Sequence, residues 1–592
     1  MSEKYNVTNY PVSHFLNAIE SKEIVVPEIQ RPFVWTSTQV RDLIDSLYNG
    51  YPTGYLIMWQ NPNVRLKSGE NSEGKKILID GQQRITALMT AIGGHKILNA
   101  NYQEKIIKIA FNPVAKNSDE RFAVPSSAHV KSSIWIDDIS KVFAKGFSSH
   151  KFINQYIKDN PNADEDEVEN SISKLRAISN CQLGVIQLVS NLSISEVTEI
   201  FVRINSQGKR LNEADFAMSK IAADSEHGGI FLRKAIDYFC RLIVDNSFYS
   251  RLESNESEFT NSEYAQKISW LKSGIDEIYA PDYSDMLRVS CMNTFNRGKL
   301  SVLVSLLSGR DFEERTYKEE IVADSFGRLK IGILNFVNEY NFKQFVLAIK
   351  SAGFVTPKIL NSKITLDFAY TLFLILQESG EVPKIEIKRY VQKWFVLSTL
   401  TARYITSPES QMDRDLREIA AKGFKTFFAE NEHALLPENF WNVRLVQNLE
   451  TSSTSSPYFN VWLAAQNFFG DHSLLSKSSH VADLITIAGD VHHIFPKEYL
   501  RQNGFDDRNF YNQVANYSYL DTSLNISIGK RPPNEYFTKA LESSDEEFFY
   551  KNLDENCIPH EIINMTVENY REFLKSRRFL MAQKIRQYYA AL

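Results

Sequence analysis

Two adjacent histidines near the C-terminus, His492 and His493, stand directly before an apolar residue pair and a proline. One imidazole of such a pair can bind a metal ion while its neighbour takes a proton from water. Asn516, Asn525 and Lys530 follow in a polar, turn-rich stretch. Asparagine needs hydrogen-bond partners when it is buried, so it is a poor core residue. These residue types suit hydrolysis of a phosphodiester by a single hydrated cation. Two ordinary histidine side chains are the plainer alternative.

The same stretch resembles the HNH (His-Me finger) nucleases, whose ββα-metal fold places two strands and a helix around one ion. The resemblance implies that His492 is the first metal ligand and His493 the general base. It implies that Asn516 orients the base through its backbone, that Asn525 is the second metal ligand, and that Lys530 contacts the scissile phosphate. The third letter of the motif is Asn rather than His, a variation that the family tolerates. Mg²⁺ or Mn²⁺ is the expected cofactor.

A second candidate site is a pentapeptide that joins an expected strand at 76–79 to an expected helix. Its members are Asp80, Gly81, Gln82, Gln83 and Arg84. The glycine permits a tight turn, and the first N–H groups of the helix then favour an anion. Arg84 adds donors suited to a phosphate, and Asp80 could hold a cation or a ribose hydroxyl. A common strand-to-helix turn with a surface salt bridge is the alternative.

Two further stretches, 26–35 and 201–208, accompany this pentapeptide. Together, over about residues 10–225, they resemble the N-terminal domain of the GmrS type of modification-dependent restriction enzymes. The resemblance implies a ParB/sulfiredoxin-like α/β fold that binds GTP or ATP. The residues that it places at the nucleotide are Asp80, Gly81, Gln82, Gln83 and Arg84, with Gln30, Arg31, Arg203 and Asn205. No GxxxxGK[ST] motif is evident, so the nucleotide site is not expected to be of the Walker type.

The elements around the pentapeptide follow from local patterns. Apolar spacing predicts a helix over 37–48, capped by Thr36 or Ser37 at its start and ended by Gly50. Short strands are expected at 23–26, 54–59 and 183–188. An insertion at about 112–180 carries the acidic run 163–169, which favours a solvated helix start over a nucleic-acid mimic or a regulatory arm.

The segment 226–450 has apolar residues at helical spacing, and its frequent aromatic residues favour a helical core over a stacking platform for bases. We expect helices at 230–244, 329–340, 366–377 and 391–404. This helical middle is expected to join the outer domains and to carry part of the DNA surface or a homodimer interface. The polar stretch 451–457 is typical of a linker. The closing helix, 566–589, has basic residues that could reach a phosphate backbone or simply form a solvated face. These are Lys575, Arg577, Arg578, Lys584 and Arg586.

Length and composition limit the number of domains, the nature of any DNA-binding surface and the cellular location. The chain has 592 residues, which is too long for one core, and we expect an α+β multidomain protein with domains at 1–225, 226–450 and 451–592. Net charge is −5, so any DNA surface must be a local basic patch. Four separated cysteines without a CxxC pair fit a reducing cytoplasm. No signal peptide or long apolar run predicts a membrane segment.

The order of these parts resembles the GmrSD, BrxU and SspE group of prokaryotic antiphage proteins. That resemblance implies a metal-dependent DNA endonuclease that cuts or nicks phage DNA, often modified, under the control of nucleotide binding or hydrolysis. Two alternatives remain open. One is a non-catalytic, nucleotide-responsive sensor or adaptor that binds DNA, and the other is an NTPase that acts by depleting nucleotide.

Overall fold

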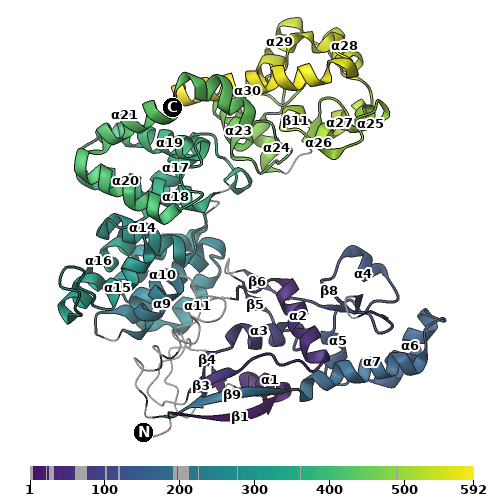
Figure 1. Cartoon of the computed structure of the whole chain (residues 1–592), viewed down its shortest axis with the longest axis vertical. Coiled ribbons are helices and arrows are strands. Elements are labelled where there is room, and N and C mark those ends of the chain that lie inside the picture. Colours follow the sequence, from purple (N-terminus) through teal and green to yellow (C-terminus); the bar gives the residue numbers. More distant parts are fainter. Residues whose placement is uncertain are drawn as a thin grey trace. The chain divides into compact units, whose positions relative to one another are not determined.

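The computed structural model describes residues 4–21, 23–25, 33–59, 76–99, 103–117, 120–190, 192, 197, 200, 213–224, 226–275, 278–360, 362–487 and 491–592. Gln30, Arg31, Arg203 and Asn205, which the sequence places at a nucleotide, lie outside these residues. The chain divides into two compact units (Figure 1). Unit 1 comprises 1–274 and 306–326, and unit 2 comprises 275–305 and 327–592. The three-domain division stays a prediction.

Unit 1 is built on a five-stranded mixed sheet in the order β1-β9-β3-β4-β2. The strands are β1 (Tyr5–Pro11), β9 (Gln182–Leu188), β3 (Leu56–Trp59), β4 (Lys76–Asp80) and β2 (Ile24–Val25). β1 pairs antiparallel with β9, and β3 pairs antiparallel with β4, whereas β9–β3 and β4–β2 are parallel. The strands expected at 54–59, 76–79 and 183–188 are thus confirmed. An irregularity between Ile57 and Met58 sits opposite the end of β4.

Three helices cover this sheet: α1 (Val12–Glu20), α2 (Ser37–Tyr48) and α3 (Gln82–Ala91). α2 begins as predicted, because the side chains of Thr36 and Gln39 form a capping box. Beyond its end, Gly50 adopts a positive φ of 73°. Val40, Ile44 and Leu88 are among the buried side chains that form the core between helices and sheet. Burial of these apolar faces is the main stabilising term of the unit.

The remainder of unit 1 is mostly helical. Two short ladders join β5 (Ile97–Leu98) to β6 (Glu104–Lys105) and β7 (Ala110–Phe111) to β8 (Phe122–Ala123). The helices are α4 (Ser127–Lys131), α5 (Ser140–Phe143), α6 (Ser149–Asp159), α7 (Glu165–Ala177), α9 (Glu213–Ala223), α10 (Gly229–Val244), α11 (Phe248–Asn255), α12 (Ser257–Thr260) and α13 (Glu263–Ile268). The Asp164 side chain accepts from the N–H of Glu167, so the acidic run is the predicted helix start.

Unit 2 starts as a stack of helices. They are α14 (Tyr283–Phe295), α17 (Glu339–Ser351), α18 (Lys363–Ser379), α19 (Lys384–Leu400), α20 (Pro408–Lys422), α21 (Phe424–Leu435) and α22 (Leu445–Asn448). α15 (Leu300–Leu307) and α16 (Glu319–Val337) run from one unit into the other. Two expected helices end early. The pattern at 329–340 breaks because the Asn338 side chain caps α17, and α19 stops before Ala402, whose φ is 54°.

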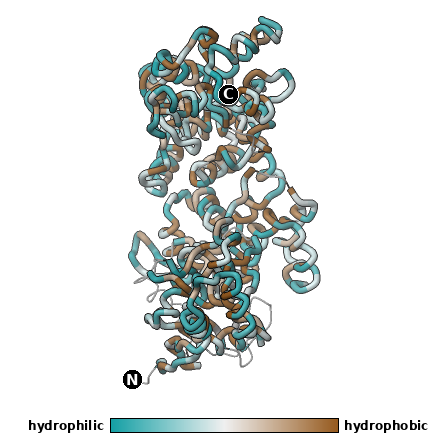
Figure 2. Tube along the Cα trace, turned by 90° about the vertical axis from the view of Figure 1, so that its right-hand side faces the viewer, coloured by the Kyte–Doolittle hydropathy of each residue, from teal (hydrophilic) through white to brown (hydrophobic). Residues whose placement is uncertain are grey.

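Most aromatic residues of α18, α19 and the turn after them are core residues, as predicted: Tyr370, Phe373, Trp394, Phe395 and Tyr404 are all buried. Tyr370 and Trp394 are fully buried, and the ring N–H of Trp394 donates to the hydroxyl of Tyr404. Along the helices in Figure 2, hydrophobic and hydrophilic stretches alternate, as amphipathic helices require. The rings pack against one another, so they are not available as a platform for nucleic-acid bases.

The C-terminal part of unit 2 carries the two histidines. Its elements are α23 (Pro457–Phe469), α24 (Val481–Thr486), β10 (Val491–His493), α25 (Lys497–Gln502), α26 (Arg508–Tyr511), η6 (Val514–Asn516), β11 (Tyr517–Tyr519), α27 (Thr522–Ile528), α28 (Pro533–Ser543), α29 (Glu546–Glu555) and α30 (Tyr570–Ala591). The stretch 451–457 is not a free linker. The carbonyl of Thr451 accepts from the N–H of Val514, and the carbonyl of Ser452 accepts from the Tyr517 hydroxyl.

The α+β, multidomain expectation is confirmed by these two units. The four cysteines are free thiols, as their spacing predicts. Among the described residues, no helix has both the length and the apolar character needed to cross a membrane.

Candidate active site

A two-stranded ladder and one helix bring the predicted nuclease residues together. β10 pairs antiparallel with β11, which sets His492 opposite Ser518 and His493 opposite Tyr517. α27 follows β11 after a short turn and returns Asn525 to the ladder. As a result, Nδ1 of His492 lies 2.8 Å from Oδ1 of Asn525. Residues far apart in the sequence thus meet in the order strand, strand, helix.

His492 is set up as a neutral imidazole. His492 is 3% exposed, and this burial lowers its pKa to about 4, while its hydrogen bond to the amide oxygen of Asn525 raises the pKa. The positive charge of Arg577 contributes to the lowering. Nε2 of His492 is buried and has no hydrogen-bond partner in the described structure. At neutral pH the ring therefore carries a lone pair, as a metal ligand must.

The donor pair fits a small divalent cation. Neighbouring ligand atoms of an octahedral ion with bonds of about 2.1 Å lie about 3 Å apart. The separation between His492 Nδ1 and Asn525 Oδ1 has this size. Without an ion this contact is a hydrogen bond from Nδ1–H to the amide oxygen, so an ion between the two atoms would require the ring proton to be on Nε2, which has no other partner among the described residues. A nitrogen and an amide oxygen suit Mg²⁺ or Mn²⁺, which keep several waters and need few protein ligands.

His493 has a partner that the sequence pattern does not indicate. Its Nε2 lies 3.0 Å from Oδ1 of Asn512, in the loop between the two strands. An amide oxygen only accepts, so the proton sits on Nε2 and the Nδ1 lone pair is free to take a proton. Burial lowers the pKa of His493, and the charge of Lys497 adds to this effect. The ring packs edge-to-face against Tyr517 at 5.1 Å.

Asn516 is a fully buried clamp on this loop. Its backbone carbonyl accepts from the N–H of Ile494, and its Oδ1 accepts from the N–H of Phe495, both at 2.8 Å. Its Nδ2 donates to the carbonyls of Phe495 and Tyr511. The same side chain thus holds the residues that follow His493 and the residue that precedes Asn512. That this clamp orients the base, as expected for Asn516, stays a prediction.

A buried arginine on α30 supports β11, the second strand of the ladder. Arg577 of α30 is fully buried, and its guanidinium donates to the carbonyls of Ala515, Tyr517 and Asn556. Burial lowers the pKa of this guanidinium to about 10. The sequence pattern predicts that Arg577 lies on a solvated face or reaches a phosphate backbone, and this prediction is wrong. Its hydrogen bonds instead fix the backbone at the start of β11.

The other basic residues of α30 are mostly paired as well. Arg578 donates to Glu450 at 2.6 Å, Lys584 pairs with Asp471, and Arg586 pairs with Glu438. Lys575 is exposed. Lys530, the predicted phosphate contact, is exposed immediately beyond the end of α27. Among the solvent-exposed cationic residues, Lys530 is therefore the nearest in sequence to α27, the helix that carries Asn525.

The pentapeptide of unit 1 forms a rigid turn at the end of β4. Gly81 has a φ of 94°, and a Cβ added there would lie 2.1 Å from Cδ2 of Leu56. Only glycine fits this position on both counts. The turn places the first N–H groups of α3 beyond the strand end. Gly81 has no side chain that could accept a hydrogen bond from them.

Arg84 and Gln83 make specific contacts beside this turn. The Arg84 guanidinium donates to the carbonyls of Thr53 and Tyr55 at 2.8 and 2.7 Å and to Asp80 at 3.1 Å. Burial lowers the pKa of Arg84, while the charge of Asp80 opposes this. Arg84 therefore braces the backbone before β3. Gln83 Oε1 accepts from the N–H of Val34 at 2.8 Å, so the described end of the stretch 26–35 reaches the pentapeptide.

Comparisons with known proteins bear on the same region. Residues 12–222 match the family model described as the N-terminal domain of the GmrSD restriction endonuclease. That description suggests a restriction nuclease with DNA as its substrate. The chain is also similar to an uncharacterized protein of Methanocaldococcus jannaschii, at 22% identity over 630 residues that cover 95% of this chain and 96% of the relative.

Proposed function

From a GmrSD-type N-terminal domain joined to a strand–strand–helix histidine site, we propose that this protein is a metal-dependent DNA endonuclease of the restriction type. Its substrate would be phage DNA, with modified bases or backbone, which it cuts or nicks. The observation that carries the proposal is the meeting of His492 with Asn525 and of His493 with Asn512 in one small ladder-and-helix site. The site is of the HNH type.

The proposed reaction is attack of water on a phosphodiester. Nδ1 of His493 takes the proton of the attacking water, a bond forms between that oxygen and phosphorus, and the bond to the leaving sugar oxygen breaks. Asn512 keeps the proton on Nε2, and Asn516 holds both parts of the loop in place. Lys530 contacts the scissile phosphate. A Mg²⁺ or Mn²⁺ ion held by His492 and Asn525 would supply charge stabilisation at the phosphate and the leaving oxygen.

The N-terminal domain is proposed to bind GTP or ATP and to regulate cleavage. The phosphates would lie at the start of α3, beside Gly81, Gln82 and Gln83. Asp80 would remain on the edge of this site, paired with Arg84. The three bonds that Arg84 already makes give it the role of holding the turn rather than that of a mobile phosphate clamp. Gln30, Arg31, Arg203 and Asn205 are proposed to complete the nucleotide site.

The test is cleavage of modified and unmodified phage DNA with Mg²⁺, with and without GTP or ATP. Wild type, His493→Ala and Asp80→Asn are compared, and binding of labelled nucleotide is measured for each. Loss of cutting in His493→Ala, together with loss of the nucleotide effect in Asp80→Asn, supports the proposal. Wild type that binds DNA and nucleotide without cutting would support a sensor, and nucleotide turnover without DNA would support depletion.

A further inference from the structure

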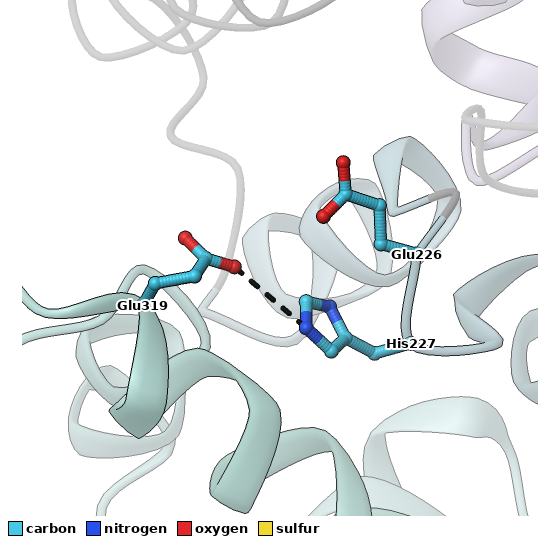
Figure 3. Close-up of side chains that lie close together, drawn as sticks. All are labelled: Glu226, His227 and Glu319. Atoms are coloured by element: carbon cyan, nitrogen blue, oxygen red, sulfur yellow. Dashed lines mark ion pairs between the residues drawn. The ribbon is translucent and has the colours of Figure 1, made fainter.

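A cluster in unit 1, remote in sequence from both sites above, has the composition of a metal centre. His227 lies in the turn before α10, next to Glu226, and Glu319 is the first residue of α16 (Figure 3). One ligand atom from each of these residues lies within 4.8 Å of the others. Nε2 of His227 is 3.7 Å from Oε1 of Glu319. The three side chains face a common point from two separate segments.

The carboxylate of Asp224 orients the imidazole of His227 so that its other nitrogen, Nε2, can bind a metal ion. Nδ1 of His227 lies 2.7 Å from Oδ1 of Asp224. Oδ2 of Asp224 accepts from the backbone N–H groups of His227 and Gly229, both at 2.9 Å, so this carboxylate is fixed. The proton therefore sits on Nδ1, and the Nε2 lone pair is on the side of Glu319. Metal-binding histidines almost always have such a partner on their second nitrogen.

Two packing features hold the ring in this position. The His227 ring stacks on Phe326 of α16, with centroids 5.6 Å apart and planes at 19°. A Cβ on Gly229 would meet the carbonyl oxygen of Ile221 at 2.1 Å, so the turn is closely packed against the end of α9. The ring can neither rotate freely nor move away with its turn. An incidental ion pair of two exposed side chains would need none of this support.

We propose that Glu226, His227 and Glu319 bind a divalent transition-metal ion, Zn²⁺ in the first place. Neighbouring ligands of tetrahedral Zn²⁺, with bonds of about 2.0–2.1 Å, lie about 3.3 Å apart. Binding would therefore draw His227 and Glu319 together from 3.7 Å and bring Glu226 in from no more than 4.8 Å. One imidazole and two carboxylates leave a fourth position for water. The ion ties the turn that follows the GmrSD-type domain to the start of α16, which makes it a structural clamp within unit 1. This inference is independent of the proposed nuclease chemistry.

The test is Zn²⁺ stoichiometry by equilibrium dialysis of the full-length protein. All variants carry His492→Gln, so that the nuclease site contributes little to the count. We expect the parent protein, which carries His492→Gln alone, to bind one more Zn²⁺ than the His227→Ala and Glu319→Gln variants do. Asp224→Asn should weaken Zn²⁺ binding by about 10- to 100-fold, because it removes the orienting carboxylate. Glu320→Gln is the matched control, since Glu320 is the exposed neighbour of Glu319 in the first turn of α16.

Thermal unfolding provides a second readout. Zn²⁺ should raise the Tm of the parent relative to the protein in EDTA, and Glu319→Gln should lose this increase while keeping its Tm in EDTA. The inference is overturned if Glu319→Gln binds as much Zn²⁺ as the parent. It is also overturned if Glu320→Gln loses the ion equally, because the binding would then reflect general negative charge. Glu226→Gln gives the same comparison if His227→Ala does not fold.

Discussion

Nε2 of His493 lies 3.0 Å from the amide oxygen of Asn512, and this one contact decides which nitrogen of the ring can act as a base. Because the oxygen only accepts, Nδ1 is the atom left without a proton. The loop that supplies Asn512 is fixed by the buried side chain of Asn516. Base, tautomer and loop are therefore a single structural unit.

Substitution of Asn512 tests this relationship. Asn512→Ala should lower the cleavage rate by about 100-fold, because a base held 1 Å out of place costs about that factor. Asn512→Asp keeps an acceptor for Nε2–H and should retain more activity. Its negative charge favours the protonated ring, so the acid limb of the pH–rate profile should move to higher pH. Equal rates and equal profiles for all three proteins would show that Asn512 has no orienting role.

The pH dependence of stability should reveal His492. Its pKa is lowered to about 4 in the folded chain, against about 6.5 in an unfolded one. The unfolded state therefore binds more protons between these values, and stability falls as pH decreases from about 6.5 to about 4. The full shift corresponds to about 3 kcal/mol.

His492→Gln removes this pH-dependent contribution to the free energy of unfolding, since glutamine does not titrate. Urea unfolding of wild type and variant at several pH values should show a difference in stability that narrows as pH falls. The comparison must be between variants, because Asp471 has its pKa raised by burial to about 6 and contributes in the opposite direction. A stability difference that stays constant with pH would contradict the neutral, buried state of His492.

Glycine 81 offers a test of the turn in unit 1. Gly81→Ala introduces both a Cβ clash with Leu56 and an unfavourable positive φ, so we expect a loss of at least about 2 kcal/mol. Gly50→Ala is the matched control, because Gly50 has a φ of 73° but nothing within 4 Å of an added Cβ. It should cost about 1 kcal/mol. Similar thermal shifts for the two variants would mean that the contact with Leu56 does not constrain the turn.

Arg84 is expected to act on stability before it acts on nucleotide binding. Arg84→Ala leaves Asp80 and the carbonyls of Thr53 and Tyr55 without this donor, which should cost about 3 kcal/mol in unit 1. Arg41→Ala, which removes an arginine that pairs with its neighbour Asp42, should change stability little. Thermal unfolding monitored with and without nucleotide separates the two effects. An unchanged Tm for Arg84→Ala would favour a direct role at the phosphates.

The sequence predicts those features that depend on neighbouring residues. The cap at Thr36, the strand that ends at Asp80 and the helix start at Asp164 are all of this kind. The pairing of Asn512 with His493 is not, because it depends on how the loop between two strands closes. Arg577 shows the same limit. Its charge indicates the surface, but the carbonyls of Ala515 and Tyr517, at the start of β11, form a buried acceptor site that only the folded chain contains.

The most direct test of the proposed active site is cleavage of supercoiled plasmid or phage DNA in Mg²⁺ by wild type, His493→Ala and His560→Ala. His560 is the control, a half-exposed histidine of the same unit that pairs with Asp554. Loss of the base should lower the cleavage rate by about 10²- to 10⁴-fold in His493→Ala, with wild-type rates in His560→Ala. If His493→Ala cuts as fast as wild type while both fold normally, His493 is not the base and the proposed active site is wrong.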